Sequence, residues 1–176
     1  ALFEIGQQVG ERVDVKGVGV TGSGRYLTAD FVGGDVVRSE ITAQARAAIA
    51  IDSTVDTIFE IGGQDSKYIS LDNGAVVNFA MNSACAAGTG SFLEEQAKKF
   101  DISLEDIGPM SLAAKRPVNL GERCTVFMET SIAAHLGRGA EMTDLTAGLC
   151  YAIVKNYLNR VVGQKKIGDR IFFQGG

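Results

Sequence analysis

The alternation of apolar and polar residues along the chain predicts several β-strands. The first contains Val13, Val15, Val18 and Val20 and is interrupted by Gly17 and Gly19. Two later strands flank Asn73-Gly74, a dipeptide typical of a type I′ turn because both positions of that turn need a positive φ. The predicted strands span residues 13–20, 57–61, 66–71, 75–81 and 170–173. We therefore expect an antiparallel hairpin in the middle of the chain.

Apolar residues also recur at spacings of three and four, which predicts amphipathic helices. The strongest stripe belongs to a helix that begins near residue 143 and consists of Leu145, Leu149, Ile153, Tyr157 and Val161. The other predicted helices cover residues 39–51, a segment that opens at Thr89 or Gly90, a segment from about 103 toward 115, and the Met128, Ile132, Leu136 repeat. A hairpin followed by a helical crossover is typical of an α/β layer fold with a mixed sheet.

We place a domain boundary near residue 52, ahead of the central hairpin. The chain opens inside predicted structure and stops at Gly175-Gly176, directly after a predicted strand. We therefore expect a fragment of a longer protein, with residues 1–52 and 53–176 belonging to different lobes.

Composition narrows the class of protein. The 176 residues are 45% hydrophobic, which is enough for a sizeable core. A net charge of −4 creates no field that would attract nucleic acid or an anionic membrane, and no apolar stretch approaches the ~20 residues of a membrane span. No signal peptide precedes Leu2, and three cysteines without a disulfide framework fit a reducing compartment. We expect a cytoplasmic protein that binds neither nucleic acid nor membrane.

Two cysteines are placed where a thiolate would be favoured. Cys85 lies in Ala84-Cys85-Ala86-Ala87-Gly88-Thr89-Gly90, just ahead of a predicted helix, and Cys124 follows 39 residues later, ahead of another. The unpaired N–H groups and dipole of a helix start favour the thiolate form. Two thiolates are half of the four that a cubane iron–sulfur cluster uses, and a two-fold dimer would supply the rest. Burial as small hydrophobes remains an equal alternative here, whereas Cys150 lies in an apolar helix and is expected to pack in the core.

A second constellation is Glu60-Ile61-Gly62-Gly63-Gln64-Asp65-Ser66-Lys67, at the end of a predicted strand. Consecutive glycines let backbone N–H groups approach phosphate oxygens without interference from Cβ atoms. Asp65 could hold Mg²⁺ through water, and either Asp65 or Gln64 could orient an attacking water. Gly175 and Gly176 could form a second turn that contacts nucleotide. Most Gly-Gly pairs are plain turns, so a turn without a ligand stays open.

These stretches resemble the BadF/BadG/BcrA/BcrD-type ATPase family, which contains the activators of 2-hydroxyacyl-CoA dehydratases and the ATP-binding subunits of benzoyl-CoA reductase. The resemblance covers nearly the whole chain. It is carried by residues 61–67, by Phe79-Ala80-Met81-Asn82 with the Cys85 motif, by Arg123-Cys124-Thr125-Val126-Phe127, and by the segments at 21–25 and 39–42.

The resemblance implies an actin-like, sugar-kinase-like fold with two ribonuclease-H-like lobes, of which this chain holds the end of the first and most of the second. It implies ATP or ADP with Mg²⁺, bound at Gly62, Gly63, Gln64, Asp65, Gly175 and Gly176. It implies a homodimer through the helix ends at Cys85 and Cys124, with a [4Fe–4S] cluster shared between the subunits. ATP hydrolysis would then drive an electron from ferredoxin or flavodoxin to an acyl-CoA dehydratase or reductase.

Other classes of function stay open. The N-terminal Asp-x-Gly-Ser/Thr phosphate turn of this superfamily is not in the sequence, so nucleotide binding by this chain is itself an expectation. A small-molecule kinase of the same fold would use Asp65 at a phosphoryl-transfer site and carry no iron. A non-catalytic docking lobe would bind neither ATP nor iron, and a Cys₄ zinc site in a dimer is a further possibility.

Overall fold

The computed structural model describes residues 2–82, 88–122 and 125–175, and these divide into two compact units. The first unit covers residues 1–47 and the second covers residues 48–176. The division falls inside helix α3 (Glu40–Ile51), which Ser39 caps with its side-chain oxygen at the Thr42 N–H, 3.3 Å away. The assignment of residues 1–52 and 53–176 to two ribonuclease-H-like lobes stays a prediction.

The first unit contains short elements around a two-stranded parallel ladder. Its strands β1 (Gly19–Val20) and β2 (Val36–Val37) pair residue for residue. Its helices are α1 (Leu2–Val9), the 3₁₀ turn η1 (Gly10–Arg12) and α2 (Arg25–Val32). The elements predicted from sequence did not include α1, α2 or β2.

The predicted strand over residues 13–20 is wrong for most of its length. Only Gly19–Val20 is a strand, and Val13 and Val15 are exposed. β-Branched valines favour an extended chain, but a strand also needs a neighbour to accept its backbone hydrogen bonds. The Val18 N–H is instead bound by the Asp35 carboxylate at 2.8 Å.

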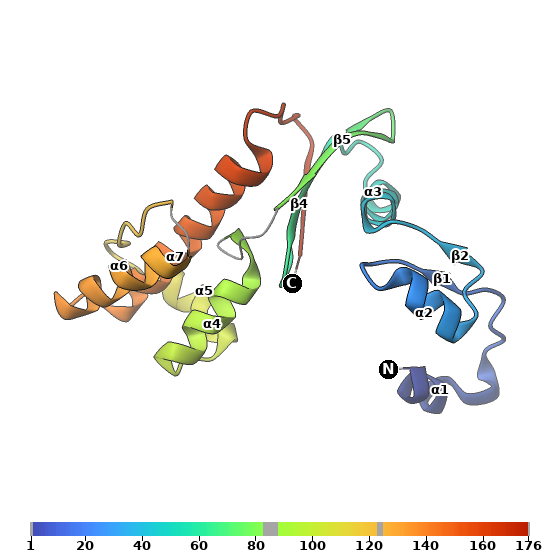
Figure 1. The fold of residues 1–176 in the computed structure, drawn as a ribbon, viewed down its shortest axis with the longest axis horizontal. Helices are drawn as coiled ribbons and strands as arrows, with labels where there is room; N and C mark the ends of the chain where they lie inside the picture. The colour runs from blue at the N-terminus through green and yellow to red at the C-terminus, as the bar shows by residue number, and fades with distance from the viewer. Residues whose placement is uncertain (1, 83–87, 123–124, 176) are drawn as a thin grey trace. The chain divides into compact units, whose positions relative to one another are not determined.

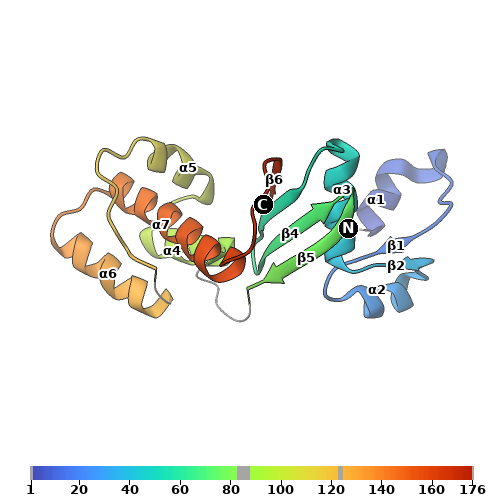
Figure 2. The same ribbon diagram turned by 90° about the horizontal axis from the view of Figure 1, so that it is seen from above.

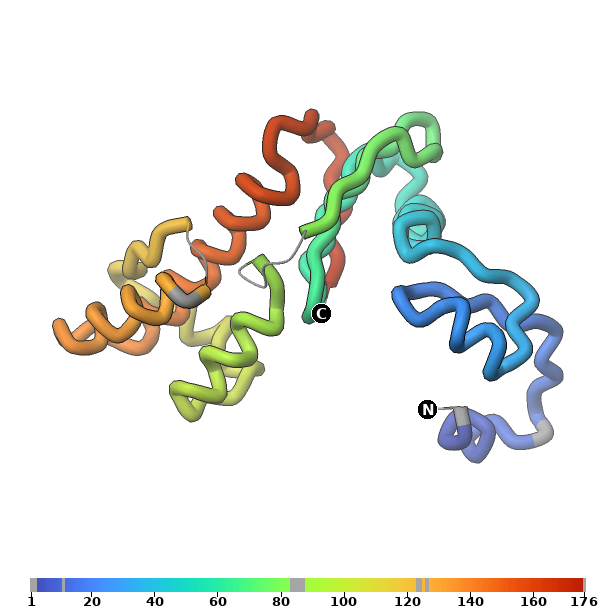
Figure 3. Tube along the Cα trace, viewed as in Figure 1, coloured from blue at the N-terminus to red at the C-terminus, as the bar shows by residue number. Residues whose placement is uncertain are grey.

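The second unit is built on a four-stranded mixed sheet in the order β5-β4-β3-β6 (Figures 1 and 2). The strands are β3 (Thr57–Ile61), β4 (Ser66–Asp72), β5 (Ala75–Met81) and β6 (Ile171–Gln174). β3, β4 and β5 form an antiparallel meander, and β6 returns parallel to β3; Figure 3 traces this return in red. Asn73 and Gly74 have φ values of 49° and 76°. The mixed sheet and the type I′ hairpin are confirmed.

The crossover between β5 and β6 is helical. It consists of α4 (Gly90–Phe100), α5 (Leu104–Leu112), α6 (Thr125–Gly137), α7 (Met142–Asn156) and a π-helical extension, η3 (Tyr157–Val162). Helices α4 to α7 lie on the same side of the sheet in Figures 1 and 2. Each helix that the sequence predicted in this unit is present, with ends shifted by a few residues.

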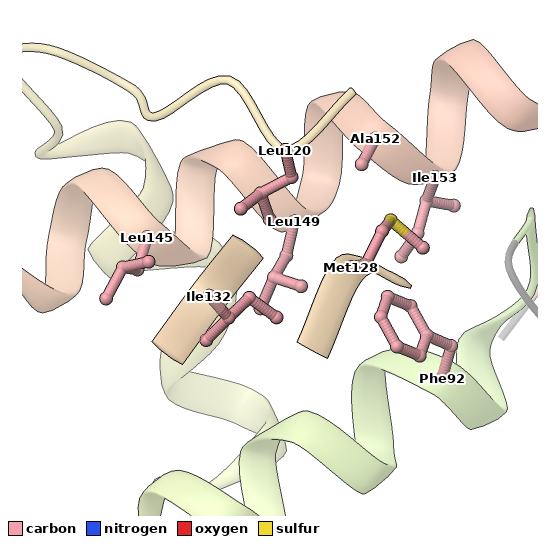
Figure 4. Close-up of a cluster of buried hydrophobic side chains, with 8 residues drawn as sticks. All are labelled: Phe92, Leu120, Met128, Ile132, Leu145, Leu149, Ala152 and Ile153. Carbon is pink, nitrogen blue, oxygen red and sulfur yellow. The ribbon is translucent and has the colours of Figure 1, made fainter. Parts of the chain in front are cut away.

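The core of this unit joins α4, α6 and α7. Figure 4 shows its side chains directed toward one another: Phe92, Leu120, Met128, Ile132, Leu145, Leu149, Ala152 and Ile153. The predicted stripe on α7 is buried throughout, and its last members, Tyr157 and Val161, pack with Tyr68 against the sheet. Cys150 is half-buried rather than fully packed. Its sulfur lies 3.4 Å from the Ser111 hydroxyl, on the flank of α7 that faces α5.

Candidate functional site

The glycine-rich segment is a tight turn between β3 and β4. The Gly62 N–H donates to the Asp65 carbonyl at 2.9 Å, which closes the turn. A Cβ atom at Gly62 would lie 2.8 Å from a Glu60 carboxylate oxygen and 3.0 Å from the Asp65 carbonyl, so a larger residue there would have to displace both oxygens. Gly63 and Gln64 are exposed at the tip. The turn expected at the end of the strand over residues 57–61 is confirmed, and it leads into the next strand of the hairpin.

Beneath the turn lies a cluster of three charged groups, of which Glu60 and Lys67 are buried. Glu60 and Lys67 are opposite each other in the β3–β4 ladder, and Lys67 is only 3% exposed. The Lys67 ammonium lies 3.2 Å from Glu60 and 2.5 Å from Asp65 Oδ1. Burial works against the charged ammonium, but the hydrogen bond to Asp65 and the negative charge of Glu60 outweigh it, so the pKa of Lys67 lies above its usual value.

This cluster fixes how Asp65 presents its carboxylate. Lys67 occupies Oδ1, and no hydrogen bond is made to Oδ2 by any residue that the structure describes. About a third of the Asp65 side chain is exposed. One oxygen is therefore used to hold the side chain in place, and the other is available to a ligand in solvent. Sequence reasoning selected Asp65 but missed the roles of Glu60 and Lys67.

The first turn of α4 is bound directly to the glycine-rich turn. The Gly90 N–H donates to the Gly62 carbonyl at 2.9 Å, and the Ser91 N–H donates to the Gly63 carbonyl at 2.6 Å. The Ser91 hydroxyl donates to the same Gly63 carbonyl. The helix start that the sequence predicted at Thr89 or Gly90 is confirmed, with Thr89 as its N-cap. Its attachment to Gly62 and Gly63 was missed, because no sequence pattern links residues 28 positions apart.

Gly175 comes to the same edge of the sheet as the glycine-rich turn. β3 and β6 are parallel, so their carboxyl ends meet there. A Cβ atom at Gly175 would lie 2.1 Å from the Ile61 carbonyl, and its φ of 141° also favours glycine. The structure thus brings Gly62, Gly63, Gln64, Asp65 and Gly175 to one edge, whereas Gly176 lies outside the described residues.

Cys85 and Cys124 also lie outside the described residues, but the helices that follow them are described. Phe92 in the first turn of α4 and Met128 in the first turn of α6 belong to one buried cluster (Figure 4). Farther along, Lys99 of α4 forms an ion pair with Glu129 of α6, and the Gln96 amide lies 3.5 Å from the same carboxylate. α4 and α6 are therefore joined through one shared core and through the ion pair at Glu129.

The π-helical segment connects these parts. The Tyr157 hydroxyl donates to the Lys67 carbonyl at 2.8 Å, and burial raises the pKa of Tyr157 above its usual value. The Asn159 amide donates to the Glu122 carboxylate. A Cβ atom at Gly88 would lie 3.4 Å from the Tyr157 nitrogen. One short segment thus touches the strand of the charged cluster and residues that precede both α4 and α6.

The described residues contain neither a metal-ligand cluster nor a membrane-spanning helix. In the described ranges, no three side chains from His, Cys, Asp and Glu are grouped as ligands of a metal ion. No helix in those ranges is both long and apolar enough to cross a bilayer.

A mixed sheet with a glycine-rich turn at one edge and a helical crossover is what the predicted actin-like α/β fold requires, and comparison with known proteins shows that fold. The model of the BadF/BadG/BcrA/BcrD ATPase family matches residues 1–176. The chain belongs to this family.

Two relatives and one solved structure illustrate the similarity. The chain is 39% identical over 158 residues to the 2-hydroxyisocaproyl-CoA dehydratase activator of Clostridioides difficile, covering 89% of this chain and 57% of the relative. It is 36% identical over 143 residues to the (R)-2-hydroxyglutaryl-CoA dehydratase activating ATPase of Acidaminococcus fermentans, covering 81% and 53%. The solved activator of the 2-hydroxyisocaproyl-CoA dehydratase from Clostridium difficile with bound ADPNP superposes with a TM-score of 0.89 at 34% identity, covering 99% of this chain and 65% of that one. The predicted fold and family are confirmed, and the chain spans a little over half the length of these curated relatives.

We expect Lys67→Met to destabilise the protein by about 3 kcal/mol, because removing one partner of a buried ion pair leaves the other charge uncompensated. The raised pKa of Lys67 means that its contribution is fully present below the usual lysine pKa of 10.5 and is lost as the pH rises through the higher folded value. Urea unfolding at several pH values measures the difference from wild type.

The matched control is Lys98→Met, which removes an exposed ion pair with Glu94 and should cost about 0.5 kcal/mol or less. Equal costs for the two variants at pH 8 would contradict the account of the buried cluster.

Proposed function

We propose that the protein binds ATP at the glycine-rich turn and hydrolyses it. The observation that carries this proposal is the turn itself, where two glycines, an exposed Gln64 and a held Asp65 carboxylate come together at one sheet edge. Small turns of this kind expose backbone N–H groups, which suit phosphate oxygens. The solved relative with bound ADPNP supports the choice of ligand.

In this proposal each residue has a distinct role. Gly62 and Gly63 allow the phosphates to approach the backbone, and Asp65 holds Mg²⁺ through water with the oxygen that Lys67 leaves open. Gln64, at the exposed tip, orients the water that attacks the terminal phosphate. Gly175 and Gly176 form the second turn, on the nucleoside side.

We further propose that the protein activates an acyl-CoA dehydratase or a related reductase. The two curated relatives are named as a dehydratase activator and a dehydratase-activating ATPase, which supports this class of partner. The electron donor in this scheme is a ferredoxin or flavodoxin. In this scheme the protein receives the electron from the donor and passes it to the partner enzyme, so neither of them has to contact the ATP.

The proposed redox group is a [4Fe–4S] cluster held by Cys85 and Cys124 of two identical chains. The donor set fits half of such a site, since each chain offers two thiols ahead of helix starts. The shared core supports the proposal, because Phe92 and Met128, in the first turns of the helices that follow the two cysteines, both belong to it. Bound there, the cluster would accept and release one electron at a time.

Asp65→Asn tests the hydrolytic role. We expect the rate of ATP hydrolysis by the complete protein to fall roughly 100-fold, the usual cost of losing one group that stabilises the transition state, with a smaller loss of ATP affinity. A phosphate-release assay measures the rate. Asp101→Asn is the control, since Asp101 is exposed at the end of α4 with a φ of 55° that asparagine also accepts. Wild-type hydrolysis by Asp65→Asn would contradict the assignment.

Iron analysis after anaerobic purification tests the cluster. We expect about two iron atoms per chain, because a dimer shares four, and we expect Cys85→Ser and Cys124→Ser each to abolish the iron and its visible absorption. Cys150→Ser should keep both, because Cys150 lies against Ser111. An iron-free wild type that still hydrolyses ATP would instead fit a kinase-like ATPase.

A further inference from the structure

We propose that Ser91 is a positioning residue of the nucleotide site, and that it holds the glycine-rich turn so that the N–H groups of Gly63 and Gln64 face the phosphates. This inference rests on the proposed ATP binding and assigns a role to a residue outside the glycine-rich turn. Ser91 touches no nucleotide in this scheme. It acts through the Gly63 carbonyl.

The direction of the peptide groups carries the argument. The Gly62 and Gly63 carbonyls both point at the first turn of α4, where Gly90 and Ser91 donate to them. In a trans peptide the C=O and the following N–H point in opposite directions. The N–H groups of Gly63 and Gln64 therefore both point away from α4, and neither is bound by an acceptor within the described residues.

Two successive N–H groups that point the same way form a concave site for an anion. Phosphate suits it because each oxygen accepts hydrogen bonds and carries negative charge. The nearby Asp65 carboxylate would repel a bare anion, so the pair of N–H groups and the carboxylate together suit a phosphate that carries Mg²⁺. The geometry points to the Mg²⁺–ATP complex rather than to free phosphate.

Ser91 is the best placed residue to hold this arrangement. It donates twice to the Gly63 carbonyl, once from its backbone and once from its hydroxyl. The next residue, Phe92, is fully buried in the core between α4, α6 and α7. The turn is thus fixed to a helix whose first turn cannot move without disturbing the core.

Ser91→Ala tests the proposal, because it removes the hydroxyl and keeps the backbone bond. We expect the Kd and KM for Mg²⁺–ATP to rise about three- to tenfold, the effect of one lost hydrogen bond, while kcat changes less. Ser91→Thr keeps a hydroxyl and should recover most of the affinity. Ser103→Ala, at the start of α5, is the matched control and should bind as wild type does. Isothermal titration with Mg²⁺–ATP measures the affinities.

The outcomes separate this inference from the proposed function. If the wild type binds no ATP, the proposed function itself fails. If the wild type and Ser91→Ala bind equally, only the role of Ser91 is overturned. Should the variant not fold, amide resonances of the wild type decide: Gly63 and Gln64 must shift on addition of Mg²⁺–ATP, and unchanged resonances at both positions would overturn the inference.

Discussion

The N–H groups in the first turn of an α-helix have no acceptor within the helix, and in α4 the Gly62 and Gly63 carbonyls provide acceptors for two of them. These two hydrogen bonds provide partners for N–H groups of the helix and for carbonyl groups of the turn. They also fix the direction of the peptide groups at the tip, because a carbonyl that points toward α4 leaves the next N–H pointing away from α4. The shape of the candidate phosphate site follows from this contact.

Two further features hold the contact in place. The aromatic ring of Phe92 anchors α4 among side chains of α6 and α7, and the buried Lys67 ammonium ties Glu60 and Asp65 together below the turn. Burying charged groups is costly, so the cluster is weak evidence that these residues stabilise the fold. Its clearer effect is to fix the position of the Asp65 carboxylate. Tyr157 extends the same network from β4 to the end of α7.

Much of the second unit could be predicted from sequence, because its signals are local. The conformation of the Asn73-Gly74 turn follows from its φ requirements, and that of the helix from Leu145 to Val161 follows from its periodicity. The prediction of a strand over residues 13–20 was wrong because strand formation there depends on a neighbouring strand, which the local pattern does not reveal. The pairing of Ser91 with Gly63 likewise depends on how α4 docks. A phosphate-binding turn at Gly62, Gly63 and Asp65 could be predicted from the sequence. The directions of the peptide groups could not, because they depend on the contacts of the turn with α4.

Native-state hydrogen exchange tests the central contact most directly. Gly90 and Leu104 are both the first residue of a helix, but only the Gly90 N–H has an acceptor among the described residues. The account predicts that Gly90 and Ser91 exchange slowly, near the rate of amides in the core, while Leu104 exchanges quickly. Exchange of Gly90 and Ser91 as fast as that of Leu104 would contradict it.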